Sequence, residues 1–349
     1  MLRQGWPRAA LLACGGLLLL AACTLGGQPA PPVAPRGGEV SALGAGLGRG
    51  VNLGNALEAP REGEWGLVLE EGYFSAIAEA GFDAVRIPIR WNAHADAAPP
   101  YAIAPAIFQR VDWAIEQALA HDLVVVINIH HYDALMADPE GQRERFLALW
   151  RQIAEHYRDY DGRLYFELLN EPHDRLEGAL WNRCLAEALA VVRESNPERW
   201  VIVGPGGWGH VSALRALQLP EDDRRLIVTF HYYEPFRFTH QGAEWVQGSN
   251  PWMGTLWHGA EAELRAIRRD FDTAARWAQE RDRPVYLGEF GAYGKADPAS
   301  RVRWTAAVAR EAEARGFAWA YWEFGAGFGV YDRARGAWRE DLLRALLPQ

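Results

Sequence analysis

The sequence contains few cysteines, and this excludes a disulfide-stabilised fold. Of the three in 349 residues, Cys14 lies in an N-terminal leader, Cys23 lies directly after it, and only Cys184 remains in the body of the chain. No intrachain disulfide framework is therefore possible there, even in an oxidising compartment. Cys184 shares a helical stripe with Trp181 and Ala188, so we expect a buried, unreactive thiol rather than a nucleophile.

Basic charge and long apolar runs are also scarce. Lys and Arg number 36 against 45 Asp and Glu, which gives a formal net charge of −9. This balance argues against nucleic acid as a partner, because phosphate binding needs a basic surface.

The apolar run at residues 9–20 is too short to span a bilayer as a helix. It follows Arg3 and Arg8, a pattern typical of a secretory signal peptide.

The end of the leader carries a second signal. Residues 20–23 read Leu-Ala-Ala-Cys, which resembles the lipobox of bacterial lipoproteins, in which Cys23 would carry the lipid. The alternative is ordinary cleavage nearby, with Cys23 incidental. We predict a lipoprotein-type signal peptide over residues 1–22 and a Pro/Gly-rich tether over 23–44. The protein is then extracytoplasmic and held at a membrane through a lipid anchor on Cys23.

The body of the chain, residues 45–349, has no heptad pattern, no short-period repeat and no second zone of composition, so we predict one domain. Eight short apolar runs alternate with loops and segments of helical periodicity. Continuous rather than alternating hydrophobicity marks strands that are buried on both faces, as in parallel sheets. The runs are residues 49–54, 84–89, 123–129, 164–169, 200–204, 226–230, 284–288 and 318–322.

Alternating strands and helices allow either an open doubly wound sheet or a closed barrel. The count of eight favours a single (β/α)8 TIM barrel, with seven intervening segments that can hold a helix and a last helix at the C-terminus. The glycines of "GRGVNLGN" lie within the first run and do not open a helix, so a dinucleotide site receives little weight.

In such a barrel the active site lies at the carboxyl ends of the strands. Polar and aromatic residues follow nearly every run and should converge on one rim. They are Asn55, Glu58, Arg86, His130, His131, Asn170, Glu171, Trp208, His231, Tyr233, Glu289 and Trp322. A structural protein has no reason to gather such residues there.

Two carboxylates stand out on this rim. Glu171 follows the fourth strand, which Pro172 is expected to end, and Glu289 follows the seventh strand. Strands four and seven lie across a small barrel, so the two carboxyl groups can face each other over a cleft. Paired carboxylates that flank a bond are what glycosidic hydrolysis requires: one protonates the leaving oxygen and the other attacks the anomeric carbon.

The motifs "GRGVNLGNALEAP", "VRIPIRW", "LLNEPH", "FHYYEPF", "YLGEFGAY" and "AYWEFGAGFGVYD" resemble glycoside hydrolase family 5 (cellulase family A), in the same order and over about residues 47–347. The likeness is to the bacterial endoglucanase branch whose members often cut both β-1,4-glucans and β-mannans. The resemblance implies Glu171 as acid/base and Glu289 as nucleophile. It implies no cofactor and no metal.

The resemblance also assigns the residues around the two carboxylates. Asn170 would hold the sugar 2-hydroxyl, and Arg86 and Tyr233 would orient Glu289 and balance its charge. His130, His131 and His231 would line the −1 subsite above Trp322, the stacking floor. In the resembling branch the position of Glu58 touches the substrate, and Asn55 is expected beside it.

Some residues also have plainer interpretations. Glu167 and Glu323 lie in or beside apolar runs, where a buried glutamate paired with Arg or His is the common explanation. His130 and His131 do not suggest a metal, because adjacent strand residues point to opposite faces.

Tryptophan is abundant, with 16 residues. Four of them lie on helical faces and are expected in the core: Trp150, Trp181, Trp277 and Trp304. Four others lie in loops after strands five and six, where some should line the cleft: Trp208, Trp245, Trp252 and Trp257. Residues 239–257 form a long aromatic-rich loop, which favours function over disorder.

Together these observations and the resemblance predict a monomeric endo-β-1,4-glucanase that acts on a β-linked polysaccharide, glucans and also glucomannan or mannan. Retention of configuration is what the resemblance implies. A mannanase is the alternative within the same chemistry. A sugar-binding lipoprotein is the alternative of another class, but it would not need two strand-end glutamates beside an Asn and an Arg.

Overall fold

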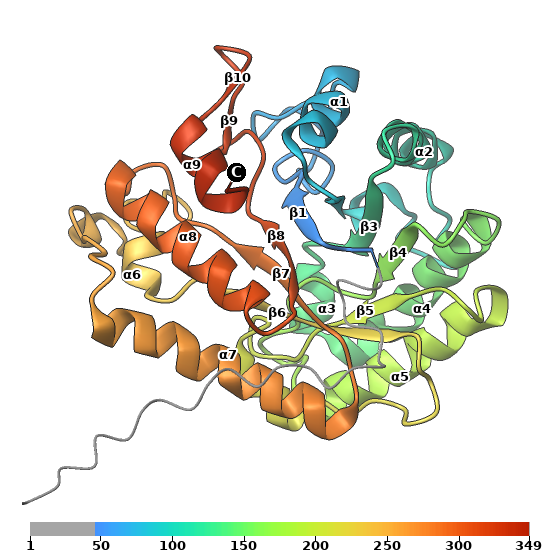
Figure 1. The fold of residues 1–349 in the computed structure, drawn as a ribbon. Helices are drawn as coiled ribbons and strands as arrows, with labels where there is room; N and C mark the ends of the chain where they lie inside the picture. The colour runs from blue at the N-terminus through green and yellow to red at the C-terminus, as the bar shows by residue number, and fades with distance from the viewer. Residues whose placement is uncertain (1–45, 349) are drawn as a thin grey trace, which may run out of the picture. The chain divides into compact units, whose positions relative to one another are not determined.

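A computed structural model describes residues 46–348, which form a closed barrel of eight parallel strands (Figure 1). Strands pair in chain order, and β8 closes the barrel on β1. They are β1 Arg49–Asn52, β2 Ala84–Ile89, β3 Val124–Ile129, β4 Leu164–Glu167, β5 Val201–Val203, β6 Leu226–Tyr232, β7 Val285–Phe290 and β8 Ala318–Tyr321. The predicted barrel is confirmed. The predicted signal peptide, the tether and Cys23 lie outside the described residues.

Helices surround the barrel (Figure 1). They are α1 Glu71–Ala80, α2 Pro105–Ala120, α3 Asp133–Ala137, α4 Pro139–His156, α5 Gly178–Ser195, α6 Phe236–Thr239, α7 Glu261–Arg281, α8 Pro298–Glu313 and α9 Glu340–Leu346. Short 3-10 helices occur at η1 Trp91–His94, η2 Val211–Ala216 and η3 Asn250–Trp252, and β9 Tyr331–Asp332 pairs with β10 Ala337–Trp338. Among residues 46–348, no helix combines the length and the apolar character that crossing a membrane requires.

The helix expected between the fifth and sixth strands is not there. The segment holds only η2, a 3-10 helix of six residues. Gly207, Trp208 and Gly209 before it have φ values of 62°, 60° and 67°, outside the helical region, and Pro220 after it would interrupt a longer helix.

Apolar side chains form two cores. The larger core fills the space between strands and helices and includes the four tryptophans predicted to be buried, Trp150, Trp181, Trp277 and Trp304, as well as Cys184. A smaller core of alternate strand residues, among them Val126 and Tyr286, fills the inside of the barrel. This inner core ends below the mouth, where polar side chains take over.

Strand β7 contains one extra residue at the mouth. Leu287 pairs with Phe230 and Glu289 pairs with His231, so Gly288 has no partner in β6. Against β8, Leu287 pairs with Trp319 and Phe290 pairs with Tyr321. Gly288 and Glu289 of β7 therefore lie opposite the single residue Ala320 of β8. A bulge of this kind changes which face the following side chain points to. Leu287 and Phe290 both belong to the outer core, and Glu289 between them is turned into the barrel.

Candidate active site at the barrel mouth

The two predicted carboxylates lie together at the mouth, with His231 between them. One oxygen each of Glu171 and Glu289 and a ring nitrogen of His231 all lie within 4.8 Å of one another. His231 Nδ1 is 2.6 Å from Glu171 Oε1 and 3.7 Å from Glu289 Oε2. Two details of the prediction are wrong: Glu289 lies within β7 rather than after it, and β4 ends at Glu167, well before Pro172.

Arg86 lies under Glu289 and is fully buried. Its five N–H groups meet five acceptors, which saturates the guanidinium. Nε and one terminal nitrogen donate to Glu167 at 2.6 and 3.0 Å; the other contacts are Glu289 Oε1 at 2.7 Å, Asn52 Oδ1 at 2.8 Å and Asn170 Oδ1 at 2.7 Å. The expected proximity of Arg86 to Glu289 is confirmed, as is the structural pairing of Glu167 with an arginine.

Burial and these contacts shift the pKa values of the two carboxyl groups in opposite directions. Burial acts to raise the pKa of Glu289, but His231, Arg86 and the Tyr233 hydroxyl, which donates at 2.8 Å, outweigh it and lower the pKa. For Glu171, burial dominates and raises the pKa despite the contact with His231, and the negative charge of Glu289 adds to the rise. Relative to a free glutamate, ionisation is therefore favoured at Glu289 and disfavoured at Glu171.

Burial and the surrounding charges also shift the pKa values of His231 and His130. Burial alone would lower the pKa of His231, but Glu289 and Glu171 together raise it. The pKa of His130 is held well below its usual value by burial and by its neighbours His131 and Arg86. His130 is therefore neutral, and its Nδ1 lies 3.1 Å from the amide nitrogen of Asn128.

One wall of the mouth is aromatic. The His130 ring stacks parallel to Trp322, with centroids 5.8 Å apart. His131 meets His130 edge-on at 4.5 Å and Trp65 at 5.3 Å. The expectation that adjacent histidines would point to opposite faces is wrong, because β3 ends at Ile129 and His131 has a φ of 34°. The alternation of a strand no longer applies there.

Glu58 and Asn55 occupy the loop after β1. Glu58 is buried, and its carboxyl group accepts the N–H groups of Asn55 and Ala56. Burial raises the pKa of Glu58 to about 8. Asn55 is half-buried and has a φ of 66°. In this structure Glu58 therefore holds the backbone of its own loop.

Glu323 binds backbone N–H groups rather than the Arg or His side chain that was expected from the sequence. Its carboxyl group accepts the backbone N–H groups of Gly325, Ala326 and Phe328. Burial raises its pKa to about 7 despite these donors. Glu323 therefore organises the loop after β8, next to Trp322.

Besides Trp65, which is 40% exposed, two tryptophans follow the fifth and sixth strands with more than half of their surface exposed: Trp208 with 56% and Trp245 with 60%. Trp208 stacks on His173 with ring centroids 3.5 Å apart, and Trp245 meets Tyr293 edge-on at 4.9 Å. By contrast, Trp257 is buried and packs in the core, so it does not line the cleft.

Several residues of the site were not identified from the sequence. The Asn52 amide donates to the carbonyls of Gly288, Ala320 and Tyr321 and accepts from Arg86, so it ties the β7 bulge to β8. A polar amide inside the apolar run "RGVNLG" was the available signal. Trp65 and His173 carried no signal beyond being aromatic or polar residues in loops.

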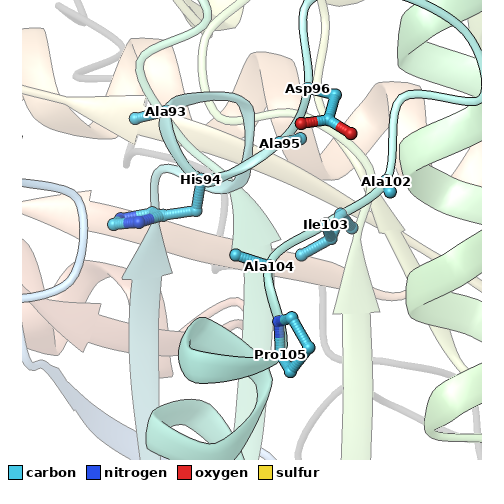
Figure 2. A pocket seen from close by; sticks show the side chains of 8 residues that line it. All are labelled: Ala93, His94, Ala95, Asp96, Ala102, Ile103, Ala104 and Pro105. Carbon is cyan, nitrogen blue, oxygen red and sulfur yellow. The ribbon is translucent and has the colours of Figure 1, made fainter.

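Within residues 46–348, three residues bring metal-ligating atoms together: Glu171, His231 and Glu289. His231 contacts both carboxylates and Arg86 contacts Glu289, an arrangement that suits proton transfer. An open depression of about 560 Å3 lies elsewhere, between η1 and the start of α2 (Figure 2). Its lining contains His94 and Asp96 among alanines and none of the rim residues, so the carboxylate cluster is the better candidate site.

Comparison with known proteins identifies the family. The cellulase family, glycosyl hydrolase family 5, matches residues 49–327. This chain is 38% identical to Endoglucanase H of Acetivibrio thermocellus over 295 residues, 84% of this chain and 31% of that protein. It is 30% identical to Endoglucanase B of Clostridium cellulovorans over 317 residues, 83% of this chain and 70% of that protein. The chain thus spans about a third of the first relative.

Solved structures agree. Thermotoga maritima Cel5A, in structures with cellobiose and with mannotriose, is 53% identical to this chain with a TM-score of 0.85, over 98% of its own length and 86% and 87% of this chain. The barrel, its carboxylate pair and these likenesses lead to one conclusion: the chain belongs to glycosyl hydrolase family 5, the cellulase family, and is a glycoside hydrolase.

Proposed function

We propose that the protein is a retaining endo-β-1,4-glucanase that uses Glu171 as acid/base and Glu289 as nucleophile. The observation that supports this most is the pair of opposed carboxyl groups, with oxygens within 4.8 Å and pKa values shifted in opposite directions. Retaining enzymes need carboxyl groups about 5–5.5 Å apart, whereas inverting ones separate them by roughly 6.5–9.5 Å to admit a water.

In the first step Glu171 gives its proton to the glycosidic oxygen, and the ionised Glu289 attacks the anomeric carbon. The leaving sugar departs and a covalent glycosyl–Glu289 ester remains. Glu171 then takes a proton from water, and the resulting hydroxide attacks the same carbon and frees Glu289. Arg86 and the Tyr233 hydroxyl keep Glu289 charged and aimed, and Arg86 fixes Asn170 for the sugar 2-hydroxyl.

Cleavage within the chain, rather than from an end, is supported by the rim. Trp208 follows β5 and Trp245 follows β6, and both remain more than half exposed. Flat aromatic faces are suited to bind sugar rings. An internal segment of polysaccharide can then lie across the mouth, with Trp322, His130 and His131 beneath the sugar at the point of cleavage.

Mannan or glucomannan is a second candidate substrate. The similar Cel5A structures contain cellobiose in one case and mannotriose in another. Glucose and mannose differ at the 2-hydroxyl, so the groups that would distinguish them are Asn170 and the loop of Asn55 and Glu58. Initial rates on mixed-linkage glucan, glucomannan and galactomannan with one enzyme preparation rank these substrates. Monosaccharide as the sole early product would contradict endo cleavage.

The roles of the two glutamates are separable by substrate. Glu171→Gln removes the proton donor, a loss typically worth about 10²–10⁴-fold in rate. The loss should shrink on aryl glycosides whose leaving group needs no proton. Glu289→Gln removes the nucleophile, so its loss should be similar for every leaving group.

The control is Glu198→Gln, the same change at a glutamate whose side chain is 80% exposed beside Arg225, which should leave rates unchanged. The opposite pattern in the two variants would reverse the assignment. Full activity in both would refute the mechanism, and binding of oligosaccharide without turnover by the unaltered protein would favour a sugar-binding role.

We also propose that the enzyme works outside the cytoplasm, tethered through Cys23. The N-terminal leader with its lipobox-like ending supports this.

A further inference from the structure

The chain has a single lysine, Lys295. It lies between β7 and α8, close to the rim. Its ammonium donates to the carbonyl of Gly242 at 2.7 Å and to Glu244 Oε1 at 2.5 Å. Both acceptors belong to the long loop that follows α6, so Lys295 joins two loops that are far apart in the sequence.

Tyr293 completes this junction. Its hydroxyl donates to the other oxygen of Glu244 at 2.7 Å, and its backbone N–H donates to the carbonyl of Thr239 at 2.8 Å. The Glu244 carboxylate is therefore held on both oxygens from the β7–α8 loop. These hydrogen bonds, from Lys295 first and Tyr293 second, lower the pKa of Glu244 to about 2.

The backbone between these contacts is closely packed. Gly242 has a φ of +67°, which favours glycine. A Cβ added there would meet Met253 and would lie 3.0 Å from Lys295 Cδ. The stem of Lys295 thus lies against Gly242 while its ammonium contacts the carbonyl of the same residue.

Trp245 follows Glu244 directly. Its ring lies against Tyr293 at 4.9 Å, Phe328 at 6.1 Å and His240 at 6.5 Å. Phe328 in turn lies 6.2 Å from Tyr233, which contacts Glu289. The ring of Trp245 is thus seated on aromatic neighbours, and the residue before it is fixed by Lys295.

We propose that Lys295 is a positioning residue for the polysaccharide: by fixing Gly242 and Glu244, it holds the Trp245 ring where a sugar can stack on it, without acting on the bond that is cleaved. This inference rests on the proposed function, because it assumes that Trp245 contacts substrate. It assigns Lys295 a part in chain binding and none in the chemical step.

The plainer interpretation is an ordinary exposed ion pair. The Lys295 and Glu244 side chains are 40% and 63% exposed, and such pairs contribute little to stability. A purely structural pair would alter the unfolding temperature slightly and leave the Michaelis constant unchanged. The two interpretations therefore differ in a kinetic constant.

The test is a double-mutant cycle on a soluble β-1,4-glucan. Lys295→Met keeps the stem and removes the charge; we expect KM to rise about two- to five-fold, the range of an exposed ion pair, with kcat unchanged. Lys295→Arg should restore most of the affinity. Trp245→Ala should raise KM at least as much, and adding Lys295→Met to it should have no further effect.

The control is Arg344→Met, which breaks an exposed ion pair on α9 with Asp341 and should leave KM unchanged. If Lys295→Met raises KM equally with and without Trp245, or lowers kcat alone, the proposal is overturned. If Trp245→Ala raises KM but Lys295→Met does not, this inference fails while the proposed function stands. Absence of glucan cleavage by the unaltered enzyme would refute the proposed function itself.

Discussion

Replacement of Arg86 should reverse the way in which the contribution of Glu289 to the free energy of unfolding depends on pH. In Arg86→Met, Glu167 and Glu289 stay buried without their shared cation. Breaking a buried ion pair by removing one partner typically costs about 3–5 kcal/mol. That is a large part of the roughly 5–15 kcal/mol that stabilises a folded domain.

The sign of the pH effect follows from Glu289. In the unaltered protein its pKa is lowered, so its contribution is present above the unfolded value of about 4.3 and is lost as pH falls. Without Arg86, only His231 and the Tyr233 hydroxyl oppose the effect of burial, and we expect the pKa of Glu289 to rise above that value. The folded state then keeps a proton that the unfolded state releases, so the destabilisation should be small below about pH 4 and grow toward neutrality.

The assay is urea unfolding followed by tryptophan fluorescence, from about pH 4 to pH 8. Arg199→Met is a matched control, because Arg199 is also buried and its five N–H groups donate to four backbone carbonyls and Asn196. It should destabilise the fold without the same pH slope. A loss below about 1 kcal/mol for Arg86→Met, or a slope equal to that of the control, would refute the reasoning.

Three further predictions concern other parts of the molecule. Burial raises the pKa of Glu58 to about 8 and that of Glu323 to about 7, so the folded state retains protons that the unfolded state releases. The unfolding temperature should therefore fall from about pH 5 to pH 8. Glu323→Gln should make this fall smaller, and an unchanged slope would contradict the prediction. Gly288→Ala places a Cβ 2.6 Å from Thr229 Oγ1 and 3.0 Å from His231 Nε2, and should lower kcat roughly 10²-fold, with partial recovery in the double variant with Thr229→Ala. Cys23→Ser should release a soluble protein with unchanged rates; equal membrane retention in a fractionation assay would exclude the lipid anchor.

The barrel could be predicted from the sequence because buried parallel strands leave continuous apolar runs. Each predicted run overlaps its strand, and the bounds differ by at most two residues at either end; β6 and β7 continue two residues beyond their runs. The absence of an α-helix before β6 was not predicted; the segment includes left-handed backbone at Trp208, a conformation that a non-glycine residue rarely adopts. Sequence periodicity does not record such a conformation.

Only part of the candidate site could be predicted from the sequence. Glu171 and Glu289 could be named because each lies near the end of an apolar run within a family motif. The orientation of Glu289 depends on the bulge at Gly288, which exists only relative to the register of β6 and β8. The contacts of Asn52 likewise join residues more than 200 positions away. No local pattern contains that information.

The solitary lysine has a practical consequence. Amine-reactive reagents find one side-chain target in this protein, and it contacts Glu244, the residue before Trp245. If Trp245 binds substrate as proposed, coupling the enzyme to a resin through that amine would turn the substrate-binding face toward the support. A small environment-sensitive dye at the same position would instead test whether a sugar chain binds to the nearby Trp245 ring. Immobilisation for biomass processing should use carboxyl or guanidinium chemistry.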